Sequence, residues 1–540
     1  MTAQPMTALQ PDAPPKSQRG VFRFLADPRT HGLSDPIERV DTANAVVFLA
    51  SADVYKVKRA VKFSFMDLST LDKRRDACEA EIAVNRPLAP TIYLAALPIV
   101  RRGETFAIGG EGDVVEWAVH MRRFDEKATL EHVVDREGVS DAIIDKLALA
   151  IRSMHARAPL RDAARAAHAL ETYIEQNRAA FAEWPDLFDP PTARKLTDDS
   201  RLATANVRPV LLKRGEAGFV RRCHGDLHLR NIVLLDGEPT LFDAVEFSDE
   251  IASGDVLYDL AFLLMDLEER GLRASSNRLF NRYLASEPPE ALTGLNALPL
   301  FLSLRAAIRA KVEAANAERL KGDKCKEARA LAHRYFDCAV HFLVAAPPRL
   351  VAVGGLSGVG KSALARALAP EIGRAPGALW LRSDAERKVM FAVDETVHLP
   401  ASAYASDVTR DVYERLIVKA QTALRAGQSV LIDASFAAAA ERSAAAGVAT
   451  ELGVPFAGLF LDAPLATRLE RISARQADAS DADVDVARRQ AAEPLAEKGW
   501  AAMAASGSLS ALTHFPSSRK YFASRSTKVR TLADRRCRCG

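Results

Sequence analysis

The stretch between residues 350 and 368 constrains this chain most, because it contains a complete phosphate-binding loop. A short apolar run at 350–353, typical of a buried strand, is followed by GGLSGVGKS at 354–362 and then by an alanine-rich helical pattern. Strand, GxxxxGK[ST] motif and helix in this order form the context in which the motif binds the phosphates of a nucleotide. The sequence therefore predicts binding of ATP, with GTP as an alternative, after residue 350.

Each residue type of this loop has a chemical role. The glycines allow the backbone to turn successive N–H groups toward one anion, and the helix N-terminus adds partial positive charge. Lys361 can reach the β- and γ-phosphates, and the Ser362 hydroxyl can ligate Mg²⁺. The predicted nucleotide-binding residues of the loop are Gly355, Ser357, Gly358, Val359, Gly360, Lys361 and Ser362.

Strand and helix patterns alternate after the loop, which indicates a parallel sheet with the nucleotide at the carboxyl ends of its strands. Apolar runs at 379–381, 429–433 and 456–461 are predicted strands. Asp433 ends the second run and is predicted to be a Walker B carboxylate that reaches Mg²⁺, unless it only begins the following turn. A further strand that would complete such a sheet is not visible in the sequence.

Asp384 and Arg387 follow the strand predicted at 379–381, where the acceptor hydroxyl of a P-loop kinase has to lie. An aspartate there can orient or deprotonate the hydroxyl, and an arginine one turn later can hold an anionic substrate. We assign these catalytic roles to Asp384 and Arg387. The alternative for Asp384 is that it caps the next helix.

A helical pattern at 466–475 places Arg468, Arg471 and Arg475 near one helix face. It resembles the arginine-bearing lid of small-molecule P-loop kinases, in which guanidinium groups neutralise charge on the transferring phosphoryl group. By this resemblance Arg471 is a nucleotide-binding residue. The alternative is a solvated basic helix.

A second informative stretch is CHGDLHLRN at 223–231, which precedes a predicted hairpin that ends in Asp243. The pattern HxDxxxxN, a hairpin and another aspartate is that of kinase catalytic and metal-binding loops. Asp226 can accept the proton of an attacking hydroxyl, and Asn231 with Asp243 can hold Mg²⁺. His224 is expected to orient the loop rather than titrate. The alternative is a polar surface turn.

Upstream, alternating residues at 40–58 predict a hairpin with a turn at 51–53, and 68–86 has a helical pattern that contains Glu81. A strand lysine followed by a helical glutamate is the pair with which a kinase small lobe holds the α- and β-phosphates. Lys56 is the candidate for this phosphate-binding lysine. The alternative is that Lys56 or Lys58 is a solvated strand residue. A GxGxxG loop is missing, so residues 42–45 would have to serve.

Two charged groups downstream leave alternatives open. Asp255 and Asp259 either line the cleft or cap a helix and anchor the catalytic loop. Arg305, Arg309 and Lys311 lie on neighbouring helical turns. This basic group either receives an anionic substrate or the other domain, or forms a solvated face.

At these residues a family resemblance is plain. HGDLHLRN at 224–231, LFDAVE at 241–246, VYKVK at 54–58 and EAEIAVNR at 79–86 resemble bacterial fusions of an aminoglycoside phosphotransferase-like domain with a C-terminal P-loop kinase domain of the AAA, zeta-toxin and gluconate-kinase type. The resemblance implies an α+β kinase-like two-lobe domain followed by an α/β P-loop NTPase domain with a parallel sheet. It makes Asp226 the catalytic base, Asn231 and Asp243 metal ligands and Lys56 the phosphate-contacting lysine. It does not name the substrate, because a fold does not fix a function.

Length and composition set the remaining expectations. A chain of 540 residues exceeds one core, and we expect a disordered leader at 1–20, a kinase-like domain at 21–345 with lobes at 21–121 and 122–345, a P-loop domain at 346–512 and a basic, disordered tail at 513–540. A net charge of +3 gives no case for specific nucleic-acid binding, although the tail could attract phosphate or RNA weakly. No apolar run is long enough for a bilayer, and six scattered cysteines favour a reducing cytoplasm.

The leading hypothesis is a cytoplasmic, bifunctional phosphotransferase that uses ATP and Mg²⁺ and moves the γ-phosphoryl group to hydroxyls of small molecules. In one alternative, the N-terminal domain is a nucleotide-sensing pseudokinase that regulates the P-loop domain; the missing glycine-rich loop favours it. In another, the P-loop domain is a toxin-like kinase that acts on a nucleotide sugar, as Asp384 with Arg387 suggests.

Overall fold

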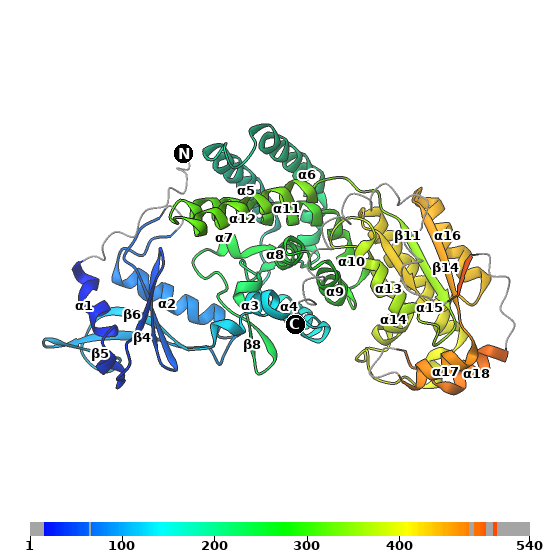
Figure 1. The fold of residues 1–540 in the computed structure, drawn as a ribbon, viewed down its shortest axis with the longest axis horizontal. Coiled ribbons are helices and arrows are strands. Elements are labelled where there is room, and N and C mark those ends of the chain that lie inside the picture. Colours follow the sequence, from blue (N-terminus) through cyan, green and yellow to red (C-terminus); the bar gives the residue numbers. More distant parts are fainter. Residues whose placement is uncertain (1–15, 64–65, 475–479, 493–499, 505–540) are drawn as a thin grey trace, which may run out of the picture.

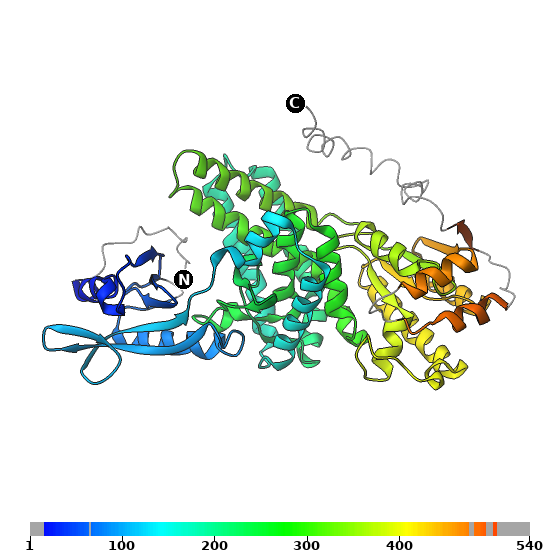
Figure 2. The ribbon, with the colours of Figure 1, turned by 60° about the horizontal axis from the view of Figure 1, so that its bottom comes forward.

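The computed structural model describes residues 16–63, 66–474, 480–492 and 500–504. Three bodies follow one another in a row: an N-terminal sheet lobe, a central helical lobe and a C-terminal α/β domain (Figure 1, Figure 2). The predicted fold class is confirmed, because an α+β two-lobe domain is followed by an α/β domain with a parallel sheet.

The small lobe is a six-stranded antiparallel sheet with the order β1-β2-β3-β6-β4-β5 and a helix on each face. Val21, Phe22 and Leu25 of α1 pack on one face, whereas Cys78 of α2 packs with Val119 on the other. The elements are α1 (Lys16–Leu25), η1 (Pro28–His31), β1 (Glu38–Asp41), β2 (Ala45–Ala50), β3 (Asp53–Lys58), α2 (Leu71–Asn85), β4 (Tyr93–Arg102), β5 (Thr105–Ile108) and β6 (Asp113–Arg122).

The large lobe is mainly helical and carries two short hairpin-like sheets, β7 with β10 and β8 with β9. Its helices are α3 (Leu130–Glu137), α4 (Asp141–Arg157), α5 (Ala163–Glu183), α6 (Pro190–Glu216), α7 (Asp249–Ala252), α8 (Val256–Glu269), α9 (Arg273–Leu284), α10 (Pro289–Leu292), α11 (Leu298–Ala317) and α12 (Asp323–Phe342), with the turns η2 (Glu126–Ala128), η3 (Leu229–Asn231) and η4 (Thr293–Asn296). Its strands are β7 (Val220–Arg222), β8 (Ile232–Leu235), β9 (Glu238–Leu241) and β10 (Ser253–Asp255).

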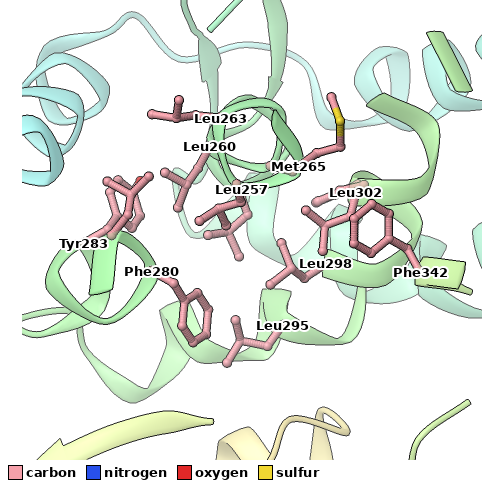
Figure 3. Packing of buried hydrophobic residues seen from close by; sticks show 14 of the residues in the cluster. Leu257, Leu260, Leu263, Met265, Phe280, Tyr283, Leu295, Leu298, Leu302 and Phe342 are labelled. Atoms are coloured by element: carbon pink, nitrogen blue, oxygen red, sulfur yellow. The ribbon is translucent and has the colours of Figure 1, made fainter. Parts of the chain in front are cut away.

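Helix α8 is the centre of the large lobe because nearly all of its side chains are buried. Leu257 and Leu260 of α8 lie beside Tyr283 of α9 and Leu298 of α11 (Figure 3). The same apolar cluster continues through Leu295 into residues of the C-terminal domain such as Leu416. The large lobe and the C-terminal domain therefore share one continuous core.

The C-terminal domain is built on a five-stranded parallel sheet with the order β12-β13-β11-β14-β15. Its strands are β11 (Leu350–Gly355), β12 (Leu379–Arg382), β13 (Val430–Asp433), β14 (Phe456–Asp462) and β15 (Ala501–Ala504). Its helices are α13 (Lys361–Leu368), α14 (Ser383–Met390), α15 (Ser406–Arg425), α16 (Ala439–Leu452), α17 (Leu465–Ser473) and α18 (Val484–Ala492), with the turns η5 (Ala369–Glu371) and η6 (Ala401–Tyr404).

Two expectations about the ends of the chain need correction. Strand β15 pairs with β14 and supplies the further strand that the sequence did not reveal, because its alanines have neither the length nor the β-branching of a clear strand signal. Helix α1 begins at Lys16, and buried Gln18 donates to the carbonyl of Lys58, so the leader predicted at 1–20 extends too far. The tail predicted at 513–540 lies outside the described residues.

Over the ranges that the structure describes, no single helix is both long and apolar enough to cross a bilayer. The segments Pro289–Asn296 and Leu298–Ala317 are long and apolar enough when taken together, but they are bent by 54° relative to each other.

Candidate active sites

The predicted catalytic residues of the first domain gather at one end of the β8–β9 hairpin. Register pairs Ile232 with Leu241, so Asn231, before β8, and Asp243, after β9, emerge at the same open end. The N–H of Phe242 donates to the carbonyl of Asn231 at 3.0 Å and closes this end. Asp226 lies five residues before Asn231 and joins the group through a side-chain bond.

Asp226 is held as an accessible carboxylate. The side-chain amide of Asn231 donates to the backbone carbonyl of Asp226 at 2.9 Å and to Oδ2 of Asp226 at 3.0 Å. His228 lies 3.3 Å from the same Oδ2. The side chain of Asp226 is still 41% exposed. Desolvation raises the pKa of Asp226, but the neighbouring His228, His224 and Arg309 lower it by more, so this pKa lies well below its usual range. Asp226 is therefore ionised at neutral pH and able to take up a proton.

The loop that carries Asp226 is anchored from beneath by Asp259 of α8. Asp259 accepts from the N–H groups of Gly225 at 2.8 Å and His224 at 3.2 Å, and its Oδ2 contacts Nε2 of His155 at 3.0 Å. Burial lowers the pKa of His224, whose Nε2 contacts the carbonyl of Phe242 at 3.0 Å. His224 thus orients the loop, as expected, and Asp259 takes the anchoring alternative.

Asp255 and Arg305 of α11 are also structural. Asp255 caps α8 through the N–H of Leu257 and forms a buried, two-bond ion pair with Arg214. Arg305 is buried and donates to the carbonyls of Tyr258 and Gly225, each at 3.2 Å. The expectation that Arg305 belongs to a solvated face or a substrate patch is therefore wrong, because its helix points it into the core.

Lys56 joins the small lobe to the segment that follows the β8–β9 hairpin. Its Nζ lies 2.8 Å from Oε1 of Glu81 on α2 and 3.3 Å from Oδ1 of Asp243. Burial lowers the pKa of Lys56, but Asp243 and Glu81 raise it by more, to well above its usual value. The alternative of a solvated Lys56 is thus excluded, and the predicted lysine–glutamate pair is present.

Lys58, two residues later on β3, is the residue whose role the sequence did not resolve. Its Nζ lies 2.5 Å from Oε2 of Glu81 and 2.5 Å from Oε1 of Glu246, and the side chain is fully buried. Glu81 is therefore shared between two lysines, and Glu246 ties the segment after Asp243 to the small lobe. In the sequence, only the short spacing from Asp243 to Glu246 could have indicated this role of Glu246.

Residues 42–44 form the turn between β1 and β2, at the place of the missing glycine-rich loop. The hydroxyl of Thr42 donates to the carbonyl of Ala45 at 3.0 Å and accepts from its N–H at 3.0 Å. The turn is short and closed by its own side chain.

The phosphate loop of the second domain leaves β11 and enters α13, as predicted. Gly355 and Gly358 have φ values of 138° and 81°, and a Cβ at either position would lie 2.6 Å from a backbone oxygen, of Leu461 and Arg468 respectively. Only glycine fits such positions without displacing the loop. Lys361 folds back and donates from Nζ to the carbonyl of Leu356 at 3.2 Å.

Asp433 stands beside the loop at the end of β13. The hydroxyl of Ser362 donates to its Oδ2 at 2.7 Å, so the two predicted oxygen ligands of Mg²⁺ lie together. Burial and the carboxylate of Asp384 raise the pKa of Asp433, while Lys361, Arg382 and Ser362 oppose this, and the pKa ends above its usual value. The carboxylate of Asp433 therefore lies beside the hydroxyl of Ser362, at the position predicted for it.

Asp384 and Arg387 are placed differently on α14. Asp384 lies in the first helical turn and not at the N-cap, which is Arg382, so the capping alternative is wrong. Arg387 is buried: its Nη2 lies 3.3 Å from the hydroxyl of Thr409, its Nη1 donates to the carbonyl of Ala403, and its Cζ lies 4.7 Å from the ring centre of Tyr404. No acidic partner of Arg387 appears among the ion pairs of the described residues.

The predicted lid arginines contact the phosphate loop from above. Arg468 donates from Nε to the carbonyl of Ser357 at 2.8 Å, and Arg471 donates from Nη1 to the carbonyl of Val359 at 2.9 Å. Gln490 of α18 accepts from the N–H of Ser357 at 3.0 Å. The solvated-helix alternative is excluded for Arg468, which is buried, whereas Arg471 is exposed although it contacts the loop; Arg475 lies outside the described residues.

The two constellations define two classes of nucleotide-handling domain. A strand lysine paired with a helical glutamate over an Asp–Asn–Asp loop is a kinase-like site, and a phosphate loop on a parallel sheet is a P-loop NTPase site. Residues 50–295 match the phosphotransferase enzyme family, and residues 350–495 match the AAA domain family. The chain therefore carries a domain of the phosphotransferase enzyme family followed by an AAA domain.

The chain is similar in sequence or in structure to several known proteins. An uncharacterized protein of Mycobacterium tuberculosis is 29% identical over 460 residues, which cover 84% of this chain and 89% of that protein. A gluconokinase from Sinorhizobium meliloti is 20% identical and covers 31% of this chain and 86% of its own, with a TM-score of 0.22. A Plasmodium vivax ethanolamine kinase is 12% identical and covers 56% of this chain and 81% of its own, with a TM-score of 0.35.

Proposed function

We propose that this protein is a bifunctional, ATP-dependent kinase in which each domain transfers the γ-phosphoryl group of ATP to a hydroxyl of a small molecule. The observation that supports it most is the position of Lys56, whose ammonium contacts Glu81 of one lobe and Asp243 of the other. This arrangement brings a cation for the α- and β-phosphates to within reach of the residues around Asp226. In the P-loop domain Lys361, Ser362 and Asp433 form the corresponding group.

In the N-terminal site, Asp226 acts as the base. The acceptor oxygen bonds to the γ-phosphorus, the bond from that phosphorus to the β,γ-bridging oxygen breaks, ADP leaves, and the hydroxyl proton passes to the Asp226 carboxylate. Its low pKa keeps Asp226 ionised, and the bond from Asn231 fixes its orientation. Asp384 has the corresponding role in the P-loop domain, where Arg387 holds a negatively charged group of the acceptor.

The donor sets of both sites fit Mg²⁺, which prefers oxygen ligands. In the first site Asn231 and Asp243 would hold it; the amide oxygen of Asn231 takes no part in the bond to Asp226, and the side chain of Asp243 is half-exposed. In the second site Ser362 and Asp433 would hold it. When bound, Mg²⁺ supplies positive charge that neutralises the phosphate oxygens.

The test uses full-length protein, a pool of hydroxyl-bearing metabolites and Mg·ATP, with mass spectrometry to detect the gain of one phosphoryl group. We compare the wild type with Asp226→Asn, Lys361→Ala and the double variant. Two sets of products are expected, one lost in each single variant and both lost in the double variant.

The result that contradicts the proposal is a product pattern unchanged by Asp226→Asn. It would favour the pseudokinase alternative, which the short turn at 42–44 also supports, since that turn has no glycine with which to cover the phosphates. A product pattern unchanged by Lys361→Ala would contradict the assignment of the P-loop domain in the same way.

A further inference from the structure

The segment 242–246 follows strand β9, carries Asp243 and is bonded on two sides. On the side of the large lobe, the N–H of Phe242 closes the β8–β9 hairpin, and the N–H of Val245 donates to the carbonyl of His224 at 2.9 Å. The N–H groups of the two residues between them donate to side chains of the small lobe. Both lobes of the first domain therefore hold the backbone around Asp243.

Tyr93 of β4 and Asn85 at the end of α2 are the small-lobe partners. The N–H of Asp243 donates to the hydroxyl oxygen of Tyr93 at 3.1 Å. The N–H of Ala244 donates to Oδ1 of Asn85 at 2.7 Å, and Nδ2 of Asn85 donates to the carbonyl of Ala244 at 3.1 Å. Asn85 therefore pairs with both backbone groups of one residue, as a residue of a neighbouring antiparallel strand would.

Both of these side chains are buried, so their positions are well defined. Asn85 is fully buried, and Tyr93 is 2% exposed. The ring of Tyr93 packs in an apolar cluster with Cys78 and Val119, which fixes the place of its hydroxyl. Because a buried N–H that loses its partner is costly, replacing Asn85 would disturb the backbone of Ala244 directly.

Asp243 needs such support because its backbone lies in the left-handed region, at a φ of 59°. Residues with a Cβ avoid this region, although aspartate tolerates it better than most. Glycine would take the same φ without strain but would bring no carboxylate. In this conformation Oδ1 of Asp243 lies 3.3 Å from Nζ of Lys56, so the strained backbone places the carboxylate beside the predicted phosphate-binding lysine.

Lys58 adds a charged contact at the far end of the same segment. Its Nζ lies 2.5 Å from Oε1 of Glu246. Strand β3, helix α2 and strand β4 thus each give one buried side chain to the segment 242–246. Asn85 and Tyr93 are the two uncharged members, so replacing them changes how the segment is held and leaves the charges around Asp243 in place.

We propose that Asn85 and Tyr93 are positioning residues for the metal ligand Asp243. They hold its backbone in the left-handed conformation, and through it they set how strongly Mg²⁺ increases nucleotide affinity at the first site. This role rests on the proposed function, in which Asp243 binds Mg²⁺. It adds that the small lobe fixes this ligand together with the β8–β9 hairpin.

The test measures nucleotide affinity at the first site with and without Mg²⁺. Full-length Lys361→Ala protein serves as the parent, because this change removes nucleotide binding at the phosphate loop. A fluorescent ATP analogue is titrated in Mg²⁺ and, separately, in EDTA. Tyr93→Phe and Asn85→Ala should each weaken binding in Mg²⁺ by about five- to tenfold, the effect of one or two lost hydrogen bonds, and leave binding in EDTA unchanged.

Two comparisons separate positioning from a general loss of structure. Tyr55→Phe is the matched control, because Tyr55 lies in the same sheet but packs with the α1 cluster on its other face. It should change neither affinity. In an Asp243→Ala background, Tyr93→Phe should have no further effect on binding in Mg²⁺, because the ligand that Tyr93 positions is gone.

The melting temperature of each variant shows whether it is folded, and Tyr93→Phe keeps the buried ring, so it decides the outcome even where Asn85→Ala does not fold. The positioning role is overturned if folded Tyr93→Phe binds in Mg²⁺ like the parent, or if its effect persists in the Asp243→Ala background. A parent protein that binds no nucleotide, or whose affinity for it does not respond to Mg²⁺, would overturn the proposed function of the first site and this role together.

Discussion

Glu81 offers the sharpest test of how the first site is held together, because its carboxylate is fully buried between two lysines. Lys56 lies 2.8 Å from one oxygen and Lys58 2.5 Å from the other. Burial raises the pKa of Glu81, but the two lysines lower it by more, to about 2 from an ordinary 4.5. That difference corresponds to about 3 kcal/mol of stabilisation at neutral pH. Glu81→Gln should therefore destabilise the N-terminal domain by about 3 kcal/mol, within the range for one lost partner of a buried ion pair.

Differential scanning calorimetry measures this change as a fall of about 4 °C in the melting temperature of the transition that includes the N-terminal domain. Glu79→Gln is the matched control, since Glu79 lies on the same helix, is 57% exposed and only approaches Arg75 at 4.0 Å. Because the folded-state pKa is lowered, the stabilisation is fully present above about pH 4.5 and is lost as the pH falls toward 2. The difference between wild type and Glu81→Gln should thus stay constant from about pH 8 to about pH 5. Equal melting temperatures for the Glu81 and Glu79 variants would refute the ion-pair argument.

Three further predictions concern the base, the metal ligands and the contact between α9 and β12. Asp226→Asn should reduce product formation at the first site by about 10²- to 10⁴-fold. The wild-type rate should show no acid limb from this residue between about pH 8 and about pH 5, because the pKa of Asp226 is low. An acid limb near neutrality that Asp226→Asn abolishes would contradict the assignment. Asp433→Asn should weaken Mg·ATP binding at the P-loop about tenfold or more, while nucleotide binding without Mg²⁺ stays unchanged. A fluorescent ATP analogue measures both affinities. Equal losses of affinity with and without Mg²⁺ would argue against a metal role of Asp433. Asn281→Ala should cost about 1 kcal/mol where α9 contacts β12, because it removes the acceptor of the partly buried N–H of Trp380. Calorimetry should show the two domains melting further apart, and an unchanged thermogram would show that β12 does not depend on α9.

Local patterns were sufficient for both phosphate-handling sites. The phosphate loop and the loop from His224 to Asn231 are short motifs in which spacing alone fixes the geometry, and the structure brings Asn231 and Asp243 to one end of a hairpin. Lys56 was the candidate lysine, and Lys58 lies two residues later on the same face of the strand. In the structure both lysines contact Glu81. No local pattern in the sequence indicates that Glu81 is shared between them.

Contacts between segments far apart in the chain account for what the sequence did not show. Asp259 anchors the catalytic loop across 34 residues from Gly225, and Arg305 is turned inward by the packing of α11 on α8. Asn277 and Asn281 of α9 bond the backbone in and just before β12, but they look like ordinary helix residues until β12 is known to be an edge strand. Such roles depend on tertiary partners, so periodicity alone cannot find them.

The two candidate sites predict that the chain binds two nucleotides, one in each domain. Isothermal titration of the full-length protein with a non-hydrolysable ATP analogue and Mg²⁺ measures this directly. We predict two nucleotides per chain for the wild type, one for Lys361→Ala, one for Lys56→Ala, and none for the double variant. A wild-type stoichiometry of one, or two nucleotides still bound by either single variant, would contradict the account.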